Sequence, residues 1–347
     1  MRINDSIVKF FFDRGIVPAE LVIYITSKCS LRCRHCYVGN NILNNGIVMT
    51  VDSIRNLLEG FAPLDRVTII GGEPLLHPNF PQIQTIFGNA AVTEKRLDSN
   101  LIDISKLDIT HAQNSGIRVC VSLDGHIEEI HSILRGPNVF SRTVRNLKNL
   151  IAKGIDIEVT HTVHAKNINL IGEFIAFCRA MGIKRLNFHK ISPRGNAIGR
   201  DDLLLRPFQW VELVELLRKM GEAAFDGRKK MQVRFETLYA TREQEIRLRT
   251  SGKYYDLAKR SFYSHHQGGR LVFFPDGKIY ISSEAFGSDS YIAKIIDGEV
   301  QWNESDWNEL KLSEKGDVRI TDLNSRAEID PLFPSILSVS YRESHLI

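Results

Sequence analysis

The sequence predicts an α/β fold, a partial (β/α)6 barrel with a small α+β extension on its C-terminal side. Two observations support this fold class. Six short runs of apolar and β-branched residues lie in the first 191 positions, and segments with helical spacing separate them. Strands and helices that alternate in this way form a parallel sheet with right-handed crossovers. In such a barrel the functional site lies at the carboxyl ends of the strands.

The expected barrel elements follow one another without a long interruption. The strands are expected at residues 21–27, 66–70, 90–97, 117–123, 155–163 and 183–191, of which 90–97 has the weakest pattern. The helices are expected at residues 51–61, 79–88, 103–113, 140–154 and 169–182, and several of them end at a glycine that can serve as a C-cap. We therefore assign the barrel to residues 1–199, with a lead-in at residues 1–19.

The pattern changes after Pro193. Residues 205–225 have the spacing of an amphipathic helix, and residues 236–260 predict one or two more. The segment "RLVFFPDGKIYIS" (270–282) predicts a hairpin with "PDG" at its turn. We expect residues 200–347 to form a helical linker and a small α+β extension that packs against the barrel.

Composition and charge exclude several classes of protein. The chain is 43% hydrophobic and 25% charged, and it has no apolar run of about 18 residues, the length that a membrane-spanning helix needs. The N-terminal segment is too rich in charge for a signal peptide. The net charge of +4 arises from 45 basic and 41 acidic residues, without a long basic stripe. We therefore expect a cytoplasmic protein with no nucleic-acid or membrane partner.

Three of the five cysteines lie together directly after the first expected strand. Cys29, Cys33 and Cys36 are too close in sequence for a disulfide framework, so we expect reduced thiols at the mouth of the barrel. One interpretation is a structural zinc site with His35 or a distant residue as fourth ligand, although such sites usually combine two C-x2-C pairs. The other is an iron-sulfur cluster whose three thiolates leave one iron open to a small molecule.

Several motifs in the barrel segment resemble those of the radical S-adenosylmethionine (SAM) enzymes. The segment "CSLRCRHCY" matches the C-x3-C-x2-C signature of this family, with His35 at the aromatic position before the last cysteine. The other matching segments are "IIGGEPLLHPNF" (69–80), "LDSN" (97–100), "VSLDG" (121–125), "LRGPNVF" (134–140) and "TVHAKNINL" (162–170). They occur in the family's order on the expected strands. One departure is Leu101, which replaces the glycine of the family's Thr-Asn-Gly segment.

The resemblance implies two cofactors, one [4Fe-4S] cluster and SAM. It assigns the cluster to Cys29, Cys33 and Cys36. It assigns contacts with SAM to Tyr37, Gly71, Gly72, Glu73, Asn100, Ser122, Asp124, Arg135 and Asn167. In this family SAM is cleaved to a 5'-deoxyadenosyl radical that takes a hydrogen atom from the substrate. The resemblance therefore also implies an external electron donor of the flavodoxin or ferredoxin type.

The two remaining cysteines are expected to pack in the core. Cys120 has the same strand parity as Ser122 and Asp124, so it projects from the same face, about 7 Å below the cofactor if that face is the interior. We favour a packing role for Cys120 over a role as hydrogen-atom donor, which leaves the catalytic residue unassigned. Cys178 lies on an expected helix and is assigned to the core.

The segment from His265 to Val300 is similar to the SPASM and twitch extensions of peptide- and sugar-modifying radical enzymes. In those extensions cysteines occupy positions that correspond approximately to His266 and Ser282, whereas this chain has no cysteine after Cys178. We therefore expect the fold of the extension without its auxiliary cluster. For His265 and His266 we favour solvated or substrate-lining roles over metal ligation.

Taken together, these features predict a radical SAM enzyme that acts in the maturation of a ribosomally made precursor peptide. A peptide-recognition module would then be a separate protein. The alternative substrate is a small sugar, nucleoside or amino acid in a natural-product pathway, and the alternative from another class is a zinc-stabilised binding protein without redox chemistry. Since no auxiliary cluster is expected to accept an electron, a redox-neutral epimerisation, rearrangement or elimination is favoured over a two-electron oxidation.

Overall fold

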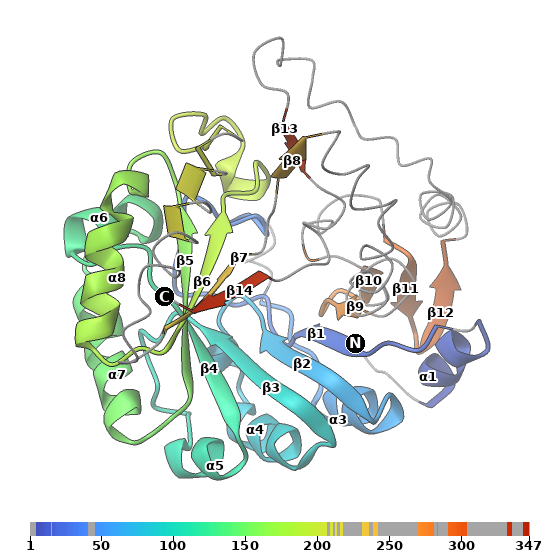
Figure 1. Ribbon diagram of the computed structural model, residues 1–347. Helices are drawn as coiled ribbons and strands as arrows, with labels where there is room; N and C mark the ends of the chain where they lie inside the picture. The colour runs from blue at the N-terminus through green and yellow to red at the C-terminus, as the bar shows by residue number, and fades with distance from the viewer. Residues whose placement is uncertain are drawn as a thin grey trace.

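Parallel strands form the centre of the protein, and helices cover their outer side (Figure 1). This computed structural model describes residues 5–14, 16–40, 46–206, 209–210, 212–213, 216–217, 231–235, 239–241, 270–280, 283, 291–303, 332–334 and 343–346. The central strands are β1 (Glu20–Tyr24), β2 (Leu64–Ile70), β3 (Val92–Ser99), β4 (Ile117–Ser122), β5 (Ile157–Val163) and β6 (Arg185–Lys190). They pair in parallel in chain order, which confirms the six expected strands and the α/β fold class.

The helices between the strands lie on one side of the curved sheet. They are α3 (Val51–Gly60), α4 (Phe80–Asn89), α5 (Ile109–Asn114), α6 (Glu128–Arg135), α7 (Phe140–Ala152) and α8 (Ile171–Ala180), with short 3-10 turns at Pro74–Leu76, Ile168–Leu170 and Gly195–Ala197. Four expected helices are confirmed. The expected helix at 103–113 begins only at Ile109, because the side chain of Asp108 caps it by accepting from the amide of His111 (2.9 Å). Helix α6 was not predicted.

The sheet continues past both ends of the six central strands. Beyond β6 lie β7 (Gln232–Phe235), which is parallel to it, and the antiparallel β14 (Glu343–Leu346). Beyond β1 lie β9 (Arg270–Phe273), β10 (Lys278–Tyr280), β11 (Ala293–Ile296) and β12 (Glu299–Trp302). Strands β9 and β10 form the predicted hairpin, and β9 is parallel to β1. The described part of the C-terminal half therefore extends the barrel sheet on both sides.

One prediction for the C-terminal half is wrong in part, and several others lie outside the described residues. Tyr239–Thr241, expected in a helix, forms strand β8, which pairs with β13 (Leu332–Pro334) in a separate two-stranded sheet. Most of the helix expected at 205–225, the rest of 236–260, and His265, His266 and Ser282 lie outside the described residues. Within the part of the chain that is described, no helix is both long and apolar enough to cross a bilayer.

The N-terminal lead-in contains a helix, α1 (Asp5–Phe12), that joins the barrel to the added strands. Its Phe11 is fully buried and packs against Phe61 at the end of α3 and against Phe273 of β9. Phe11 also meets Trp302 of β12 edge-on, at 6.4 Å between ring centroids. Helix α1 therefore fixes the edge of the barrel at β1 to the extension.

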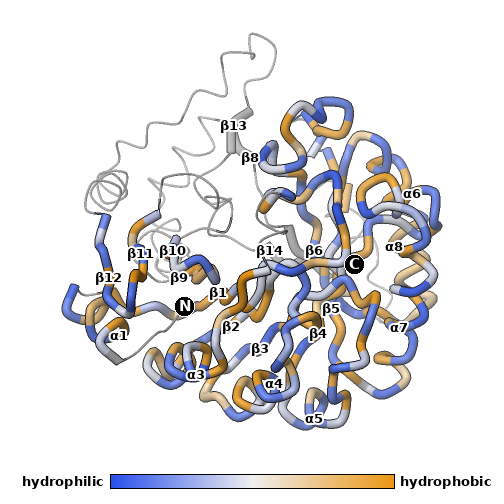
Figure 2. The backbone as a smooth tube through the Cα atoms, turned by 180° about the vertical axis from the view of Figure 1, so that it is seen from behind, coloured by the Kyte–Doolittle hydropathy of each residue, from blue (hydrophilic) through white to orange (hydrophobic). Residues whose placement is uncertain are grey.

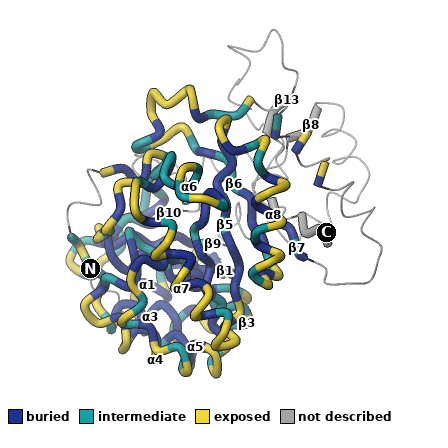
Figure 3. The backbone as a smooth tube through the Cα atoms, turned by 90° about the vertical axis from the view of Figure 1, so that its left-hand side faces the viewer, coloured by how far each residue is buried: buried dark blue, intermediate teal, exposed yellow. Residues whose placement is uncertain are grey.

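The two faces of the central strands differ in character. On the outer face, residues such as Leu21, Ile23, Val67 and Ile69 pack against the helices in one large apolar cluster. Figure 2 shows apolar residues along the strands and along the helices around them, and Figure 3 shows that the strands are largely buried while the helices carry the exposed residues. The inner face carries most of the polar and charged side chains, together with a smaller apolar cluster that includes Val22, Tyr24, Val272, Phe274 and Tyr280.

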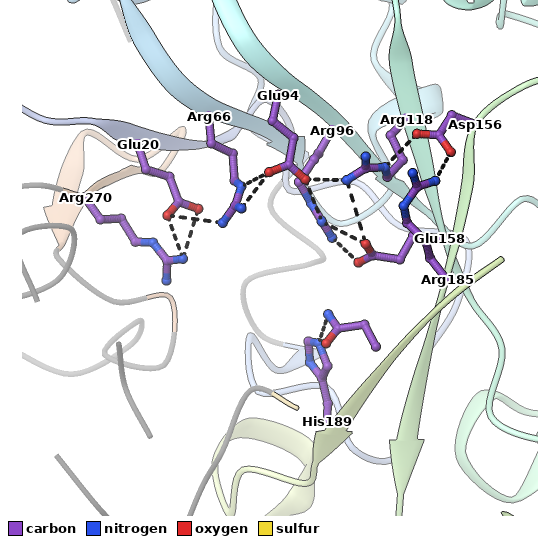
Figure 4. Close-up of polar contacts among 11 residues, drawn as sticks. Glu20, Arg66, Glu94, Arg96, Arg118, Asp156, Glu158, Arg185, His189 and Arg270 are labelled. Carbon is purple, nitrogen blue, oxygen red and sulfur yellow. Dashed lines mark hydrogen bonds and ion pairs between the residues drawn. The ribbon is translucent and has the colours of Figure 1, made fainter. Parts of the chain in front are cut away.

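Ion pairs join neighbouring strands on this inner face (Figure 4). The chain of pairs comprises Arg270, Glu20, Arg66, Glu94, Arg96, Arg118, Glu158, Asp156 and Arg185. The most buried pair is Arg96 with Glu158, whose side chains are 5% and 0% exposed and make bonds of 2.6 and 3.2 Å. A shift of one strand would separate the partners and leave unpaired charges in the interior, which is strongly unfavourable. The pairs therefore stabilise the observed register of the strands.

We predict that Glu158→Gln lowers the free energy of unfolding by about 3 kcal/mol or more, because the guanidinium of Arg96 keeps only a longer contact with Glu94 (3.4 Å). The matched control is Asp52→Asn, which breaks an exposed pair with Arg55 whose side chains are 81% and 40% exposed, and should cost less than about 1 kcal/mol. Urea unfolding of both variants measures the difference. Similar losses of unfolding free energy in the two variants would show that the buried ion pair stabilises the protein no more than the exposed one.

Candidate functional site

The three clustered cysteines lie on the loop that follows β1, at the carboxyl end of the barrel strands. Cys33 is buried and Cys29 and Cys36 are half-buried, and all three belong to one apolar cluster with Leu31, Ile102 and Val139. Burial raises the pKa of the Cys29 thiol to about 12 and that of Cys33 to about 11, although Arg135 lowers the latter in part. Without a bound cation these thiols stay protonated at neutral pH.

The loop after β6 is bound to the cysteine loop by hydrogen bonds. The Asn196 side chain donates to the Cys33 carbonyl (2.9 Å), and its backbone amide donates to the Cys36 carbonyl (2.9 Å). The same side chain exchanges two further bonds with Asn40 (3.0 and 3.1 Å). Gly195, with φ of +56°, lies against the same loop, and a Cβ atom there would be 2.4 Å from the Cys36 oxygen. The β6 loop therefore holds the backbone of two of the three cysteines.

Gly71 and Gly72, which follow β2, press against the other end of the cysteine loop. The amides of Gly72 and Glu73 donate to the carbonyls of Thr26 (2.8 Å) and Lys28 (2.7 Å). A Cβ atom would lie 2.6 Å from the Thr26 oxygen at Gly71 and 2.4 Å from the Lys28 oxygen at Gly72. The two glycines are therefore required by a close approach of two backbones, a role that the sequence motif did not reveal.

The carboxyl group of Glu73 is buried and held by three uncharged donors. It accepts from the Ser99 hydroxyl (2.8 Å) and from the amides of Asn100 (2.8 Å) and Leu75 (3.2 Å). Burial nevertheless raises the pKa of Glu73 to about 7. Because a carboxylate offers about four acceptor positions, at least one remains for a further donor. The site therefore holds a carboxyl group that a cationic ligand would stabilise in its charged form.

Asn100 and Leu101 form the turn that positions one of these donors. The side chain of Asn100 accepts from the amide of Ile102 (2.9 Å), and Leu101 has a φ of +54° while its side chain is fully buried. The left-handed conformation that favours glycine is thus present here with leucine. The structure brings Glu73 and Asn100 together, and their contacts with SAM stay a prediction.

Asp124 and Arg135 form a buried ion pair next to a cysteine. The Arg135 Nε atom donates to Asp124 Oδ2 (2.5 Å), and its Nη1 atom lies 4.0 Å from the Cys33 sulfur. Burial alone would raise the pKa of Asp124, but the guanidinium and nearby histidines hold it well below its usual range. The second oxygen accepts from the Thr162 amide at the end of β5 (2.7 Å). The pair therefore keeps a positive charge beside Cys33.

Asn167 joins the ends of two strands. Its side-chain amide donates to the carbonyls of Thr162 (3.0 Å) and Asp124 (3.2 Å), and its oxygen accepts from the amide of His164 (2.8 Å). These bonds give Asn167 a structural role. Its contact with SAM stays a prediction.

Among the described residues, four buried histidine nitrogens have no hydrogen-bond partner, on His35, His126, His131 and His164. Two of them are Nδ1 of His35 on the cysteine loop and Nε2 of His164 at the end of β5. Nδ1 of His164 accepts from the Lys166 amide (3.2 Å), so Nε2 carries the hydrogen. Burial lowers the pKa of His35 to about 3 and that of His164 to about 4, so both rings are neutral. His164 lies in the segment "TVHAKNINL", but the family motif assigned a role there only to Asn167.

The remaining predicted residues lie on the inner face or next to the cysteine loop. Ser122 ends β4 and is half-buried, and the hydroxyl of Tyr37 makes a hydrogen bond with that of Tyr24. Cys120 is 1% exposed, two residues before Ser122 on the same strand face, and burial raises the pKa of its thiol well above the usual range. Cys178 is fully buried in α8, as expected.

Among the described residues, no group of three or more His, Cys, Asp or Glu side chains is arranged to hold a single metal ion. The donor set fits a larger group. Three thiols line one loop, a guanidinium stands beside one of them, and unpartnered histidine nitrogens lie at the same end of the barrel. At the mouth of a partial barrel these groups offer thiol ligands for a metal centre and polar contacts for a small molecule.

Residues 23–178 match the family model described as the radical SAM superfamily. This superfamily uses a [4Fe-4S] cluster and SAM as its cofactors, which confirms the two expected cofactors.

Three curated relatives match part of the chain. An uncharacterized protein of Methanocaldococcus jannaschii is 27% identical over 58% of this chain and 71% of its own length. The AdoMet-dependent heme synthase of Nitratidesulfovibrio vulgaris is 25% identical over 58% of this chain and 56% of its own. The antilisterial bacteriocin subtilosin biosynthesis protein AlbA of Bacillus subtilis is 27% identical over 53% and 42%. The chain thus spans about half the length of the last two relatives.

Two solved structures have a similar fold over most of the chain. Streptococcus suis SuiB bound to precursor peptide SuiA has a TM-score of 0.65 at 16% identity, covering 86% of this chain and 67% of that one. The enzyme anSMEcpe with bound AdoMet has a TM-score of 0.64 at 18% identity, covering 85% and 83%. Since both identities are low, these likenesses support the fold.

We predict that Gly195→Ala loses most of the iron that the parent retains after anaerobic reconstitution, because the new Cβ atom displaces the backbone of Cys36 and Tyr37. Gly199→Ala is the matched control. Gly199 lies on the same loop and also has a positive φ (+73°), but no atom lies within 4 Å of a Cβ placed there. The control should keep the parent's iron content, and equal iron loss in the two variants would contradict the role of the close contact.

Proposed function

We propose that the chain is a radical SAM enzyme in which Cys29, Cys33 and Cys36 hold the [4Fe-4S] cluster. The observation that carries the proposal is the loop with three thiols, held between the Gly71–Glu73 segment and the β6 loop, with Arg135 beside Cys33. A guanidinium next to a thiol favours its thiolate, which is the form that binds metal. When bound, the cluster and SAM supply the reductive cleavage of SAM and the abstraction of a substrate hydrogen.

The surrounding residues have distinct parts in this proposal. Glu73 binds the methionyl ammonium group of SAM. This group supplies the positive charge that the buried carboxyl group of Glu73 lacks. The buried nitrogens of His35 and His164 gain hydrogen-bond partners when SAM fills the site. Asn100, Ser122, Asp124 and Asn167 shape the binding site for SAM.

We further propose that the substrate is a ribosomally made precursor peptide. The similarity to AlbA, a bacteriocin biosynthesis protein, and the shared fold with SuiB support this class. A small-molecule substrate is the alternative, and the similarity to the heme synthase supports it. Barrel residues 1–199 would carry the chemistry and residues 200–347 would shape the substrate site. Because the printed chain has no cysteine after Cys178, we favour a redox-neutral outcome.

We predict that replacing Cys29, Cys33 or Cys36 by Ala abolishes both cluster binding and the cleavage of SAM, because two thiolates do not hold the cubane. The parent, purified without oxygen, should be brown with about four irons per chain. Cys178→Ala, which removes a buried thiol on α8, is the control and should keep the iron. Colourless parent protein with one zinc per chain would replace this proposal by the zinc-stabilised binding protein.

We predict that Glu73→Gln weakens SAM binding by about tenfold or more while the iron content stays unchanged, because a charge-assisted hydrogen bond is lost. The pH dependence is a second signature. The pKa of Glu73 is raised to about 7, so the binding-competent carboxylate is lost as pH falls through 7, and the parent's affinity for SAM should fall with it. Equilibrium binding measured between pH 6 and 8 should show this slope in the parent and none in the variant. Equal affinity of the two proteins would refute the role of Glu73.

A further inference from the structure

Helix α7 has an exposed face with basic and uncharged side chains only. Its cations Arg142, Arg145 and Lys148, and Lys153 directly after its last residue, are all exposed. Because residues three or four positions apart lie on the same side of a helix, the first three cations form one row along this face. Residues 140–154 contain no aspartate or glutamate. We name these four side chains the α7 basic face.

The cations of the α7 basic face have few anionic partners. Neighbours in the row are three residues apart, and like charges at this spacing repel one another. In the described part of the chain, Arg145, Lys148 and Lys153 form no salt bridge. The pKa of the exposed Asp103 is lowered first by hydrogen bonds from the residue two positions later and, among smaller causes, by Arg142. The row therefore keeps a repulsion that an anionic partner would relieve.

The first turns of α7 are bound to the turn Asn100–Ile102, which supplies a donor to Glu73. The Thr143 hydroxyl donates to the first carbonyl of this turn (3.0 Å), and the Asn146 amide donates to the second and third (2.7 and 3.2 Å). Arg142 Nη2 also donates to the third carbonyl (3.3 Å). Because α7 precedes β5, it runs from the carboxyl ends of the strands toward their amino ends. The basic row therefore begins at the mouth of the barrel.

We propose that the α7 basic face binds an acidic segment of the peptide substrate. The inference rests on the proposed function, since it takes the substrate to be a precursor peptide. Val139, directly before α7, packs in the apolar cluster that contains Cys33 and Ile102. A peptide whose reacting residue lies near the thiol loop can therefore continue along the basic row. The 13 residues of α7 span about 20 Å, so about six residues of extended peptide cover the row.

The composition of this helix face favours an acidic peptide over a nucleic acid. Its uncharged exposed members are Ser141, Asn149 and Ala152, so the described face offers no aromatic ring for base stacking. The whole chain has 45 basic and 41 acidic residues, a smaller excess than that of the strongly basic domains that bind nucleic acid. The serine and asparagine side chains donate and accept hydrogen bonds, which a peptide backbone can match. An acidic peptide thus finds both charge pairing and backbone hydrogen bonds here.

The test measures the binding of a labelled acidic peptide to the full chain by fluorescence anisotropy. The probe is a synthetic peptide of repeated Glu-Ala-Ser units, and the same peptide with Gln in place of Glu is the uncharged reference. The test variant is Arg145→Glu/Lys148→Glu, which removes like-charge neighbours and so does not weaken the helix. Lys9→Glu/Lys184→Glu is the matched control, because it makes the same change in charge at two exposed lysines outside α7.

The expected result is a loss of affinity that is confined to one variant. At low salt the acidic peptide should bind the parent and the control equally and the test variant about tenfold more weakly, and high salt should remove the difference. The glutamine peptide should not distinguish the three proteins. Iron content and cleavage of SAM are measured separately on the anaerobically reconstituted parent.

The outcomes separate this proposal from the one on which it rests. A parent that holds no iron and does not cleave SAM would overturn the proposed function, and the assignment of the bound peptide as substrate with it. An iron-loaded, active parent with equal peptide affinities in the two double variants would overturn peptide binding at α7 alone. An oligothymidylate with the same number of negative charges tests the other class of partner. If it binds more tightly than the peptide and loses affinity only in the test variant, the α7 basic face is a nucleic-acid site and this proposal is refuted.

Discussion

The site depends on the close approach of three backbones. The cysteine loop has little regular secondary structure, so the carbonyls along it need donors from elsewhere. They receive them from Gly72, Glu73 and Asn196, and this requires distances at which the side chain of any other residue would collide at Gly71, Gly72 and Gly195. The loop therefore takes its shape from the segments after β2 and β6. Because both segments end strands of one sheet, the sheet determines where the thiols lie.

Most of the described carboxylates in the interior are paired with a guanidinium group, and Glu73 is an exception. Near the amino ends of the strands, carboxylates and guanidinium groups alternate, and Arg96 with Glu158 shows that even fully buried charges are paired. Near the carboxyl ends Asp124 is neutralised by Arg135. Glu73 instead has three uncharged donors and a pKa raised by burial, so the fold leaves one cation missing at this place. A ligand with an ammonium group would stabilise the charged form of this carboxyl group.

Local patterns account for what the sequence predicted, and contacts across the chain account for what it did not. The six strands and the cysteine loop follow from periodicity and spacing, which are local signals. Helix α6 lies directly after the "VSLDG" motif, and its glutamates and histidine conceal the short apolar stripe. Asn196 acts through Cys33 and Asn40, which lie 163 and 156 residues away, and no single-sequence pattern encodes such contacts. Leu101 shows the opposite case, because the left-handed turn persists without its glycine when a fully buried side chain offsets the strain.

The added strands connect the extension to the site through one aromatic contact. Strand β9 pairs in parallel with β1, so that Val22 lies opposite Val272, and the ring of Tyr24 stacks on Phe274 at 4.0 Å between centroids. The Tyr24 hydroxyl in turn bonds to that of Tyr37, which follows Cys36 directly. The β9–β10 hairpin thus fixes the end of the cysteine loop. This contact gives the hairpin a structural role, because the edge of β1 must be covered for the loop after it to keep its shape.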